Sequence, residues 1–314
     1  MFDLTFLGTG ASAPSAERGL PALMVGCGGR RVLIDCGEGT QRQILRAGLG
    51  FRRLDRVLLT HRHLDHVLGL GGLVATLGLL RAEGTLRIHG GRATLDFVLR
   101  YLSALWPEGG APIDIELIAL ERDVAIQEKD FAIRCFPVSH RGVESFGFRF
   151  EVPARRHLLP DRLAELGVRD GAVRAALARG ESVTLADGRT IEAAAALGPP
   201  EPGASLVVVG DVDETRSLVE PVRGADALVI EATFLEQDAV LATSYGHLTA
   251  AEAGRLAGAA EVGMLYLTHL SGRYDGDAVA AEARRYFPHV RLAADFAKYR
   301  VPEHGRGDRP RPAS

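Results

Sequence analysis

The heptapeptide THRHLDH, residues 60–66, constrains this chain more than any other feature of its sequence. It holds four side chains that commonly bind metals, and it follows directly on the apolar run Val57–Leu59. Histidine and aspartate resist burial without partners, so packing alone does not explain such a density. On an extended segment His61, His63 and Asp65 share one face, whereas a metal site on a helix would use a pair spaced by four. The spacing therefore indicates a metal site at the end of a strand.

Three further apolar runs lead into side chains of the same kinds. They are Arg134–Val138 before His140, Leu206–Val209 before Asp211, and Met264–Leu267 before His269. In layered α/β folds the carboxyl ends of neighbouring strands converge on one crevice. The side chains that would meet there suffice for two tetrahedral zinc ions with a bridging carboxylate and an open water position. The predicted ligands are His61, His63, Asp65, His66, His140, Asp211 and His269.

The composition is that of a globular protein with one large domain or two. The chain has 314 residues, of which 46% are hydrophobic and 25% charged, near the averages for globular proteins. A helix that spans a bilayer needs about twenty apolar residues, and the longest apolar run, Val67–Leu80, is shorter and contains glycines. The opening MFDLTFLGTG has neither the basic region nor the apolar length of a secretory signal. We therefore expect a cytoplasmic protein without a membrane span.

Net charge and cysteine content limit the possible functions and the cellular compartment. A net charge of -3 excludes a globally basic nucleic-acid coat, but 37 cations and 40 anions can still be segregated by face into a basic stripe. The three cysteines, Cys27, Cys36 and Cys135, are too few and too scattered for a disulfide framework. We expect each of them to be a small buried apolar residue, in a reducing compartment.

Hydrophobic patterning predicts strands that alternate with helices in both halves of the chain. The expected strands of the first half are Phe2–Leu7, Arg31–Ile34, Arg56–Leu59, Thr85–Ile88, Ile113–Ile118 and Phe131–Phe136. The expected helices there lie within residues 37–50, over a fully buried Val67–Leu80, and over Ala93–Leu105. In the second half we expect strands at Leu206–Val209, Ala227–Ile230, Met264–Leu267 and Val290–Ala293, and helices at Glu214–Val222, Thr249–Ala260 and Asp277–Tyr286.

Between the two halves, the segment from Pro153 to Gly203 has a different character. It carries seven arginines and seven acidic residues among many alanines, and it ends in the stiff stretch GPPEPG. The alternating SVTLADGRTI within it predicts a β-hairpin that turns at Asp187–Gly188. We interpret this segment as an insertion into the main fold.

At this point the motifs resemble those of the ribonuclease Z family, the tRNA 3′-processing endonucleases of the metallo-β-lactamase superfamily. The resemblance runs from about Phe2 to Tyr299 and rests on FLGTGASAPS, LIDCGEGTQRQIL, THRHLDHVLGL, SHR, VGD, EATF, GHLTAAEA and THLSGRY. It implies an α/β protein with the four-layer αβ/βα metallo-β-lactamase fold and a projecting flexible arm. Residues 1–151 and 204–301 would form the two halves of the core, 152–203 the arm and candidate tRNA-binding exosite, and 302–314 a disordered tail.

The resemblance also implies a role for each site residue. His61, His63 and His140 would hold one zinc, and Asp65, His66 and His269 the other, with Asp211 bridging the two. Asp65 would also act as general base. His247 would protonate the leaving 3′ oxygen, oriented by Glu231, and Ser271 and Arg273 would contact substrate phosphate.

The implied function is removal of the 3′ trailer from precursor tRNA by a zinc-dependent endoribonuclease, which leaves a 3′-hydroxyl on the tRNA. Two zinc ions per subunit and a homodimer are implied as well, although histidine–carboxylate sites also accept manganese or iron. One alternative is a phosphodiesterase of the same fold that acts on another nucleic acid or on a small phosphodiester. A non-catalytic RNA-binding subunit is a second, but it predicts missing ligands, and all seven are present.

Three departures from the family pattern keep the first alternative open. Leu64 stands where the family usually has glycine, and Val212 stands where it has threonine after the bridging aspartate. The arm lacks the family's proline-rich turn and is nearly neutral, which predicts weaker and less salt-sensitive docking of tRNA unless its arginines are clustered. Of the remaining polar residues, we expect Asp35 to support a histidine or cap a helix, His89 to be structural or exposed, and His157, His289 and His304 to lie on the surface.

Overall fold

The computed structural model describes residues 1–82, 84–121, 125–128 and 130–302, and within this range the chain divides into two compact units. The larger unit contains Met1–Glu151 and the described chain from Ala204 onward, and the smaller unit is Val152–Gly203.

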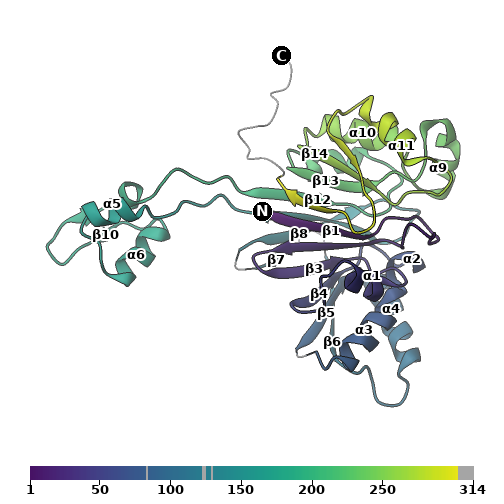
Figure 1. Ribbon diagram of the computed structural model, residues 1–314, viewed down its shortest axis with the longest axis horizontal. Helices are drawn as coiled ribbons and strands as arrows, with labels where there is room; N and C mark the ends of the chain where they lie inside the picture. Colours follow the sequence, from purple (N-terminus) through teal and green to yellow (C-terminus); the bar gives the residue numbers. More distant parts are fainter. Residues whose placement is uncertain (83, 122–124, 129, 303–314) are drawn as a thin grey trace. The chain divides into compact units, whose positions relative to one another are not determined.

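Two seven-stranded sheets form the middle of the larger unit (Figure 1). The first sheet has the order β16-β1-β2-β3-β4-β5-β6 and the second the order β15-β14-β13-β12-β9-β8-β7. The strands of the first sheet are β1 Phe2–Gly8, β2 Ala22–Cys27, β3 Arg30–Ile34, β4 Leu54–Leu58, β5 Thr85–Gly90, β6 Asp114–Ala119 and β16 Lys298–Val301. Those of the second are β7 Ala125–Gln127, β8 Ala132–Val138, β9 Ser145–Val152, β12 Ala204–Val208, β13 Ala227–Glu231, β14 Met264–Thr268 and β15 Val290–Leu292.

Helices cover the outer face of each sheet (Figure 1). On the first sheet they are α1 Thr40–Arg46, α2 Leu64–Val67, α3 Gly69–Leu79 and α4 Arg92–Leu105. On the second they are α8 Val219–Val222, α9 Ala239–Tyr245, α10 Ala250–Ala259 and α11 Gly276–Arg284, with single 3-10 turns at Arg216–Leu218 and Glu236–Asp238. The layers run helix, sheet, sheet, helix, which confirms the predicted four-layer α/β architecture.

The sheets are apolar on both faces, as expected for strands that are covered on both sides. Outward-facing residues of each sheet form one core with its helices, for example Val57 with Leu73, and Leu228 with Leu256. Between the two sheets aromatic rings meet, such as Phe6 of β1 and Tyr266 of β14, whose centroids are 6.1 Å apart. The two sheets therefore share a core that fixes the edge where the site residues lie.

The strands that matter for the site are parallel. In the first sheet β3, β4, β5 and β6 pair in parallel, and in the second β12, β13, β14 and β15 do so. Parallel strands deliver their carboxyl ends to the same edge of a sheet. The chain segments that follow β4, β12 and β14 carry six of the predicted metal ligands, and the seventh, His140, follows β8, which pairs antiparallel with β7 and β9.

The predicted helix over Val67–Leu80 is wrong in two respects. It is split at Leu68 into α2 and α3. The cause is the contact between Gly69 and the loop at Cys36–Gly37. Gly69 donates its N–H to the Cys36 carbonyl, and a Cβ on Gly69 would lie only 2.0 Å from the Gly37 oxygen. Its carboxyl end is not buried, since Leu79 is 87% exposed. The predicted helix at Glu214–Val222 is reduced to one 3-10 turn followed by the single turn α8.

Several elements escaped prediction. Strands β2, β7, β9 and β16 and helix α9 had no counterpart in the predicted elements. β2, ALMVGC, shows no alternation and ends in glycine and cysteine, so its strand conformation comes from the neighbours with which it pairs. β9 and β16, by contrast, alternate polar or small with apolar residues as a strand does, so their own sequences carried a signal that the prediction overlooked. Other predicted strands keep their place, with ends that shift by one or two residues.

The smaller unit has its own apolar core. It consists of α5 Pro160–Glu165, α6 Gly171–Ala178, β10 Val183–Thr184, β11 Thr190–Ile191 and α7 Ala193–Ala196, and its buried side chains include Leu163 and Leu177. The predicted hairpin is confirmed, since β10 and β11 pair antiparallel and Gly188 adopts the left-handed φ of 85° that the turn needs. Of the predicted tail, residues 303–314 lie outside the described range. Within that range no helix is both long and apolar enough to cross a membrane.

Candidate metal centre

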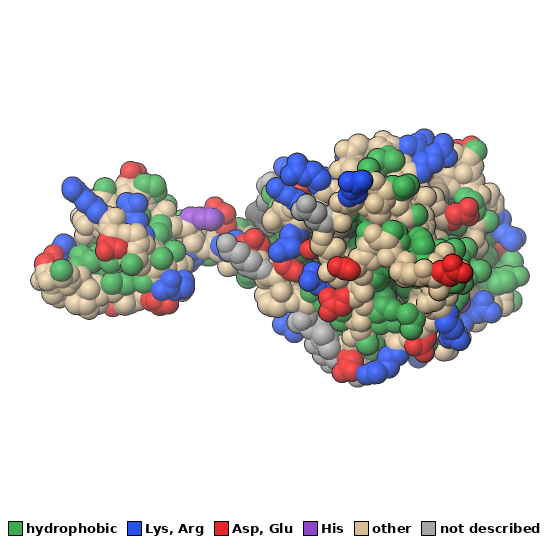
Figure 2. Space-filling view, turned by 90° about the horizontal axis from the view of Figure 1, so that it is seen from below, with side chains coloured by type: hydrophobic (Ala, Val, Ile, Leu, Met, Phe, Trp, Pro, Cys, Tyr) green, Lys and Arg blue, Asp and Glu red, His purple; other side chains and the backbone are tan. Residues whose placement is uncertain are grey.

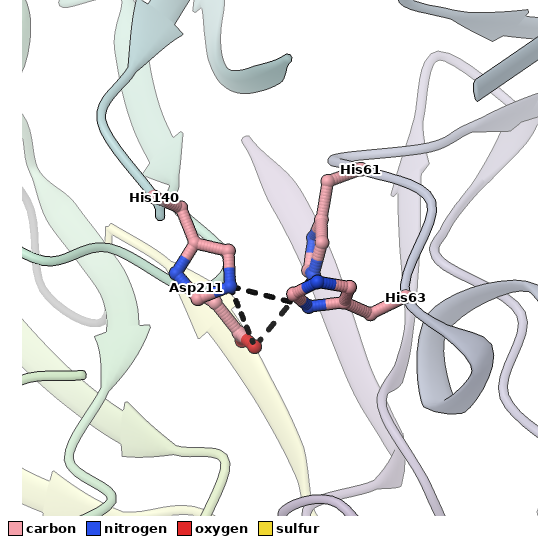
Figure 3. Close-up of side chains that lie close together, drawn as sticks. All are labelled: His61, His63, His140 and Asp211. Carbon is pink, nitrogen blue, oxygen red and sulfur yellow. Dashed lines mark hydrogen bonds and ion pairs between the residues drawn. The ribbon is translucent and has the colours of Figure 1, made fainter. Parts of the chain in front are cut away.

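The structure brings the seven predicted ligands together at one edge of the paired sheets. His61 and His63 follow β4, Asp65 and His66 lie in α2, and the other three follow β8, β12 and β14. Their ligand atoms fall into two groups within which all atoms lie within 4.8 Å of one another. The groups are His61, His63, His140 and Asp211, shown in Figure 3, and Asp65, His66 and His269.

Asp211 lies between the two groups. Its Oδ2 atom is 3.7 Å from Nε2 of His61 and 3.9 Å from Nε2 of His140. Its Oδ1 atom is 3.3 Å from Nε2 of both His66 and His269. Each carboxylate oxygen thus faces a different group, as a carboxylate that bridges two cations must.

The orientation of the histidines is fixed from behind, at Nδ1. A hydroxyl, a carboxylate or a backbone carbonyl lies within hydrogen-bond distance of this atom in four of the rings, which turns Nε2 toward the centre. The pairs are His61 with Thr60 Oγ1 at 3.0 Å, His66 with Asp35 at 2.8 Å, His140 with the Gly246 carbonyl at 2.8 Å, and His269 with Thr233 Oγ1 at 2.9 Å. His63 is the exception, because its Nδ1 faces Nε2 of His140 at 3.2 Å.

Two of the residues that build the site have a strained backbone. Asp35 and His269 adopt left-handed φ angles of 55° and 54°, in a region that only a few per cent of non-glycine residues occupy. Asp35 is held there because its N–H bonds to the Leu58 carbonyl while its carboxylate accepts from the N–H of Thr60. His269 is followed by Leu270, whose N–H donates to the Thr9 carbonyl.

The electrostatics of the cluster favour neutral imidazoles in one group. Burial lowers the pKa of His61, His63 and His140, and repulsion from neighbouring rings adds to this. At His66 burial also disfavours the charged ring, but Asp211 and Asp35 outweigh it and hold the pKa of His66 well above its usual range. The buried carboxylates therefore demand positive charge, which a protonated ring or a metal cation can supply.

The donor set fits a metal. Within the described part of the chain, the buried atoms Nε2 of His61, Nε2 of His66 and Oδ1 of Asp211 have no hydrogen-bond partner. Buried polar atoms are normally paired, so such a set of ligand atoms at one point fits a bound cation. Imidazole nitrogens and carboxylate oxygens are the ligands that zinc takes in proteins.

His247 and Glu231 lie beside this cluster as an acid–carboxylate pair. Glu231, at the end of β13, is fully buried, and Nδ1 of His247 lies 3.0 Å from its Oε1. The carboxylate also accepts from the N–H of Val212 and the hydroxyl of Thr233. Burial disfavours the imidazolium, but Glu231 outweighs it and raises the pKa of His247 to about 9. The ring centroid of His247 lies 5.2 Å from that of His269, so a protonated side chain borders the candidate metals.

Ser271 and Arg273 lie in the turn after β14, where the hydroxyl of Ser271 accepts from the N–H of Arg273 at 3.2 Å. Arg273 is exposed, and the turn alone does not assign it a ligand. Leu64 is 55% exposed at the first position of α2, between two candidate ligands. Val212 is buried, with its N–H bound to Glu231.

Of the other polar residues, Asp35 supports His66 as expected, while His89 is buried and not exposed. His157 pairs with Glu201 on the surface, and His304 lies outside the described residues. Sequence reasoning missed the supporting groups Thr60, Thr233 and the carbonyl of Gly246. The two threonines stand inside the motifs THRHLDH and EATF, which is the one signal that could have found them.

Comparison with known proteins gives consistent relatives over nearly the whole chain. Ribonuclease Z of Bradyrhizobium diazoefficiens is 60% identical over 296 residues, covering 94% of this chain and 98% of that protein. Ribonuclease Z of Archaeoglobus fulgidus is 39% identical over 305 residues, with 96% and 98% covered. A family model described as anti-Pycsar protein Apyc1 matches residues 2–83.

Solved structures agree with the fold. Human tRNase Z, short form, superposes with a TM-score of 0.65 at 26% identity, covering 96% of this chain and 98% of that one. The metallo-β-lactamase fold protein YhfI of Bacillus subtilis gives a TM-score of 0.69 at 22% identity, with 95% and 98% covered. The larger unit therefore has the metallo-β-lactamase fold.

Proposed function

Because the chain belongs to the ribonuclease Z family, we propose that it is an endoribonuclease that removes the 3′ trailer from precursor tRNA by phosphodiester hydrolysis. The observation that carries the proposal is the position of Asp211 between two ligand groups, with His247 and Glu231 beside them. Water would be added at the scissile phosphorus, leaving a 3′-hydroxyl on the tRNA and a 5′-phosphate on the trailer.

The candidate metals are two zinc ions per subunit, and manganese or iron would suit the same ligands. His61, His63 and His140 would hold one, Asp65, His66 and His269 the other, and Asp211 both. When bound, the two cations polarise the scissile phosphate and lower the pKa of a water molecule toward neutrality.

Asp65 is the proposed general base. Its Oδ2 atom accepts from the N–H of Ser12 at 3.1 Å and lies 3.4 Å from Nε2 of His269. Burial raises the pKa of Asp65, but the hydrogen bond with His269 and the nearby rings outweigh burial and lower it. The carboxylate is therefore ionised at neutral pH, positioned to orient the attacking water and accept its proton.

His247 is the proposed general acid. Its raised pKa keeps the ring protonated at neutral pH, and Glu231 holds it by Nδ1, which leaves the Nε2 proton for the departing 3′ oxygen. Ser271 and Arg273 stay predicted contacts to substrate phosphate. Their exposed turn follows His269 directly.

The smaller unit, Val152–Gly203, is the proposed tRNA-binding arm. Three of its arginines pair with neighbouring carboxylates, in the pairs Arg162–Glu165, Arg179–Glu181 and Arg189–Asp187. Charges of both signs are mixed over the face seen in Figure 2. Among the described residues, Arg169 and Arg174 are exposed and form no ion pair. They are the positions from which the arm would contact phosphate.

A homodimer in the cytoplasm completes the proposal. Helices α1, α3 and α4 carry exposed leucines, and clustered apolar surface of this kind usually marks an interface. The exposed residues are Leu45, Leu79, Leu80, Leu99 and Leu105. Analytical ultracentrifugation of the wild type against a variant with polar residues at Leu79 and Leu80 tests this surface, and an unchanged sedimentation coefficient would contradict it.

A phosphodiesterase that acts on a small substrate is the second candidate, and the near-neutral arm favours it. The decisive experiment incubates the purified protein, with and without Asp65→Ala, with a 3′-extended precursor tRNA and with bis(p-nitrophenyl) phosphate. Cleavage at the base of the acceptor stem, lost in Asp65→Ala, supports the tRNA assignment. Turnover of the small ester with intact precursor tRNA would refute it. Deletion of residues 155–198 should then impair tRNA cleavage and spare the ester.

A further inference from the structure

Arg141 follows the candidate ligand His140 and has a strained backbone. Its φ angle is 48°, in the left-handed region where glycine or asparagine would be less strained. The conformation is held because the Arg141 N–H donates to Oδ2 of Asp213 at 2.8 Å, and the Val143 N–H closes the turn onto the His140 carbonyl at 2.8 Å. The backbone gains nothing from an arginine here, so the reason for this residue lies in its side chain.

The stem of that side chain lies across Gly246, the residue before the proposed general acid. A Cβ on Gly246 would lie 2.3 Å from Cγ and 2.9 Å from Cδ of Arg141. Gly246 is also left-handed, at a φ of 69°, and its carbonyl receives Nδ1 of His140. The loop that carries His140 and the loop that carries His247 are therefore locked together, with Arg141 packed at the junction.

The charge of Arg141 is not used within the protein. The side chain is exposed, and among the described residues no carboxylate pairs with its guanidinium. By contrast Arg149, on the strand that follows, bonds to Glu151 and to two backbone carbonyls. A guanidinium group presents a fork of donors that matches the oxygens of a phosphate. An unpaired arginine at the rim of a phosphodiesterase site is therefore suited to bind a phosphate group of the substrate.

We propose that Arg141 binds a backbone phosphate of the RNA, next to the scissile phosphate on the side of His247. The inference rests on the proposed function, since it needs a polynucleotide substrate. Arg141 is a specificity determinant: it favours chains with a neighbouring phosphate over esters that have only one. It takes no proton and leaves the chemical step to the metals, Asp65 and His247.

The test replaces Arg141 without disturbing its turn. Arg141→Gln keeps the Cγ and Cδ atoms that pack on Gly246 and removes the charge, Arg141→Lys keeps the charge without the fork, and Arg100→Ala removes an exposed arginine of α4 as the matched control. We would measure the Kd for precursor tRNA without added metal over a range of salt concentrations. With zinc we would measure kcat and KM for precursor tRNA and for bis(p-nitrophenyl) phosphate.

We expect Arg141→Gln to weaken tRNA binding by about tenfold and to reduce the slope of log K against log salt by roughly 0.7–0.9, the value for one phosphate contact. KM for tRNA should rise, while kcat for tRNA and both constants for bis(p-nitrophenyl) phosphate should stay near the wild-type values. Arg141→Lys should recover part of the affinity for tRNA. An unchanged salt slope, or an equal loss with the small ester, would overturn the inference. If the wild type itself leaves precursor tRNA intact, it is the proposed function that fails.

Discussion

Oδ2 of Asp35 lies 2.8 Å from Nδ1 of His66, and the other oxygen of the same carboxylate accepts the N–H of Thr60 at 2.8 Å. The buried carboxylate of Asp35 thus orients the ring of His66 in one ligand group. It also holds the backbone at Thr60, directly before His61 of the other group. Asp35 is itself held in a left-handed conformation by this arrangement. The site depends on a residue that contacts neither the candidate metals nor the substrate.

We therefore predict that Asp35→Ala weakens zinc binding by about 10–100-fold, the usual effect of removing a carboxylate behind a ligand histidine. Competition with a chromophoric chelator measures this directly. Asp55→Ala, which removes a more exposed carboxylate on β4, is the control. Wild-type zinc affinity in Asp35→Ala would show that the orientation of His66 does not need its partner.

Removal of metal should destabilise the fold. The unpaired nitrogens of His61 and His66 and Oδ1 of Asp211 are buried with no bonding partner in the described chain, so a chelator should lower the unfolding temperature and zinc should restore it. Asp211→Ala removes the carboxylate that both groups share. Calorimetry of this variant should show little response to zinc, and metal analysis should find fewer than two ions. A full complement of two ions would contradict the bridging role.

The pH dependence of cleavage should report His247. The folded protein raises the pKa of this ring to about 9, so it is charged at neutral pH and loses its proton as pH rises. Glu231→Gln removes the charge that outweighs burial, so the alkaline fall of kcat/KM for precursor tRNA should move to lower pH. His247→Ala should slow tRNA cleavage by about 10²–10⁴-fold yet spare p-nitrophenyl esters, whose leaving group needs no proton. Equal losses of activity on both substrates would refute the assignment of His247 as the general acid.

Stability at acid pH should depend on His89. This ring is 4% exposed and forms no hydrogen bond within the described residues, and burial, aided by Arg56 and Arg87, lowers its pKa from 6.5 to about 4. The unfolded chain takes up the proton first, so the stability contributed by the neutral ring is present above pH 6.5 and is lost as pH falls toward 4. Urea unfolding at pH 7 and pH 5 should show a smaller difference for His89→Phe than for the wild type. An identical difference would exclude this ring as the source.

We predict that the arm binds precursor tRNA through a small number of unpaired arginines. Replacing Arg169 and Arg174 by alanine removes two exposed arginines whose side chains have neither an ion pair nor a hydrogen bond among the described residues, so KM for precursor tRNA should rise several-fold while hydrolysis of the small ester is unaffected. The control changes Arg179 and Arg189, which are paired with Glu181 and Asp187. If the control variant loses as much as the first, the arm's effect does not follow from unpaired charge.

The positions of the seven ligand candidates could be predicted because each follows an apolar strand, and the end of an apolar run can be identified in a sequence. The parallel pairing of β12, β13 and β14 then places their ends at one edge. The backbone partner of His140 could not be anticipated in this way. It is the carbonyl of Gly246, which lies 106 positions further along the chain, and no pattern marks a carbonyl as an acceptor.

The elements that prediction missed have different causes. β2, ALMVGC, has no alternation and is a strand through its pairing with β1 and β3, whereas β9, SFGFRFEV, alternates strictly and could have been predicted from its own sequence. The split of Val67–Leu80 into α2 and α3 depends on contact between Gly69 and the loop at Cys36. Such tertiary contacts override local preference and lie outside what periodicity can report.

The ligand groups combine residues from both sides of the arm, and this sets an order of assembly during synthesis. His61, His63, His140 and Asp211 have all emerged once β12 is made, whereas the second group waits for His269, after β14. A chain that stops between β12 and β14 would possess one metal-binding group, an orphaned Asp65–His66 pair and no second cation. If hydrolysis needs both ligand groups, we expect a chain that lacks β14 and His269 to leave cellular RNA intact.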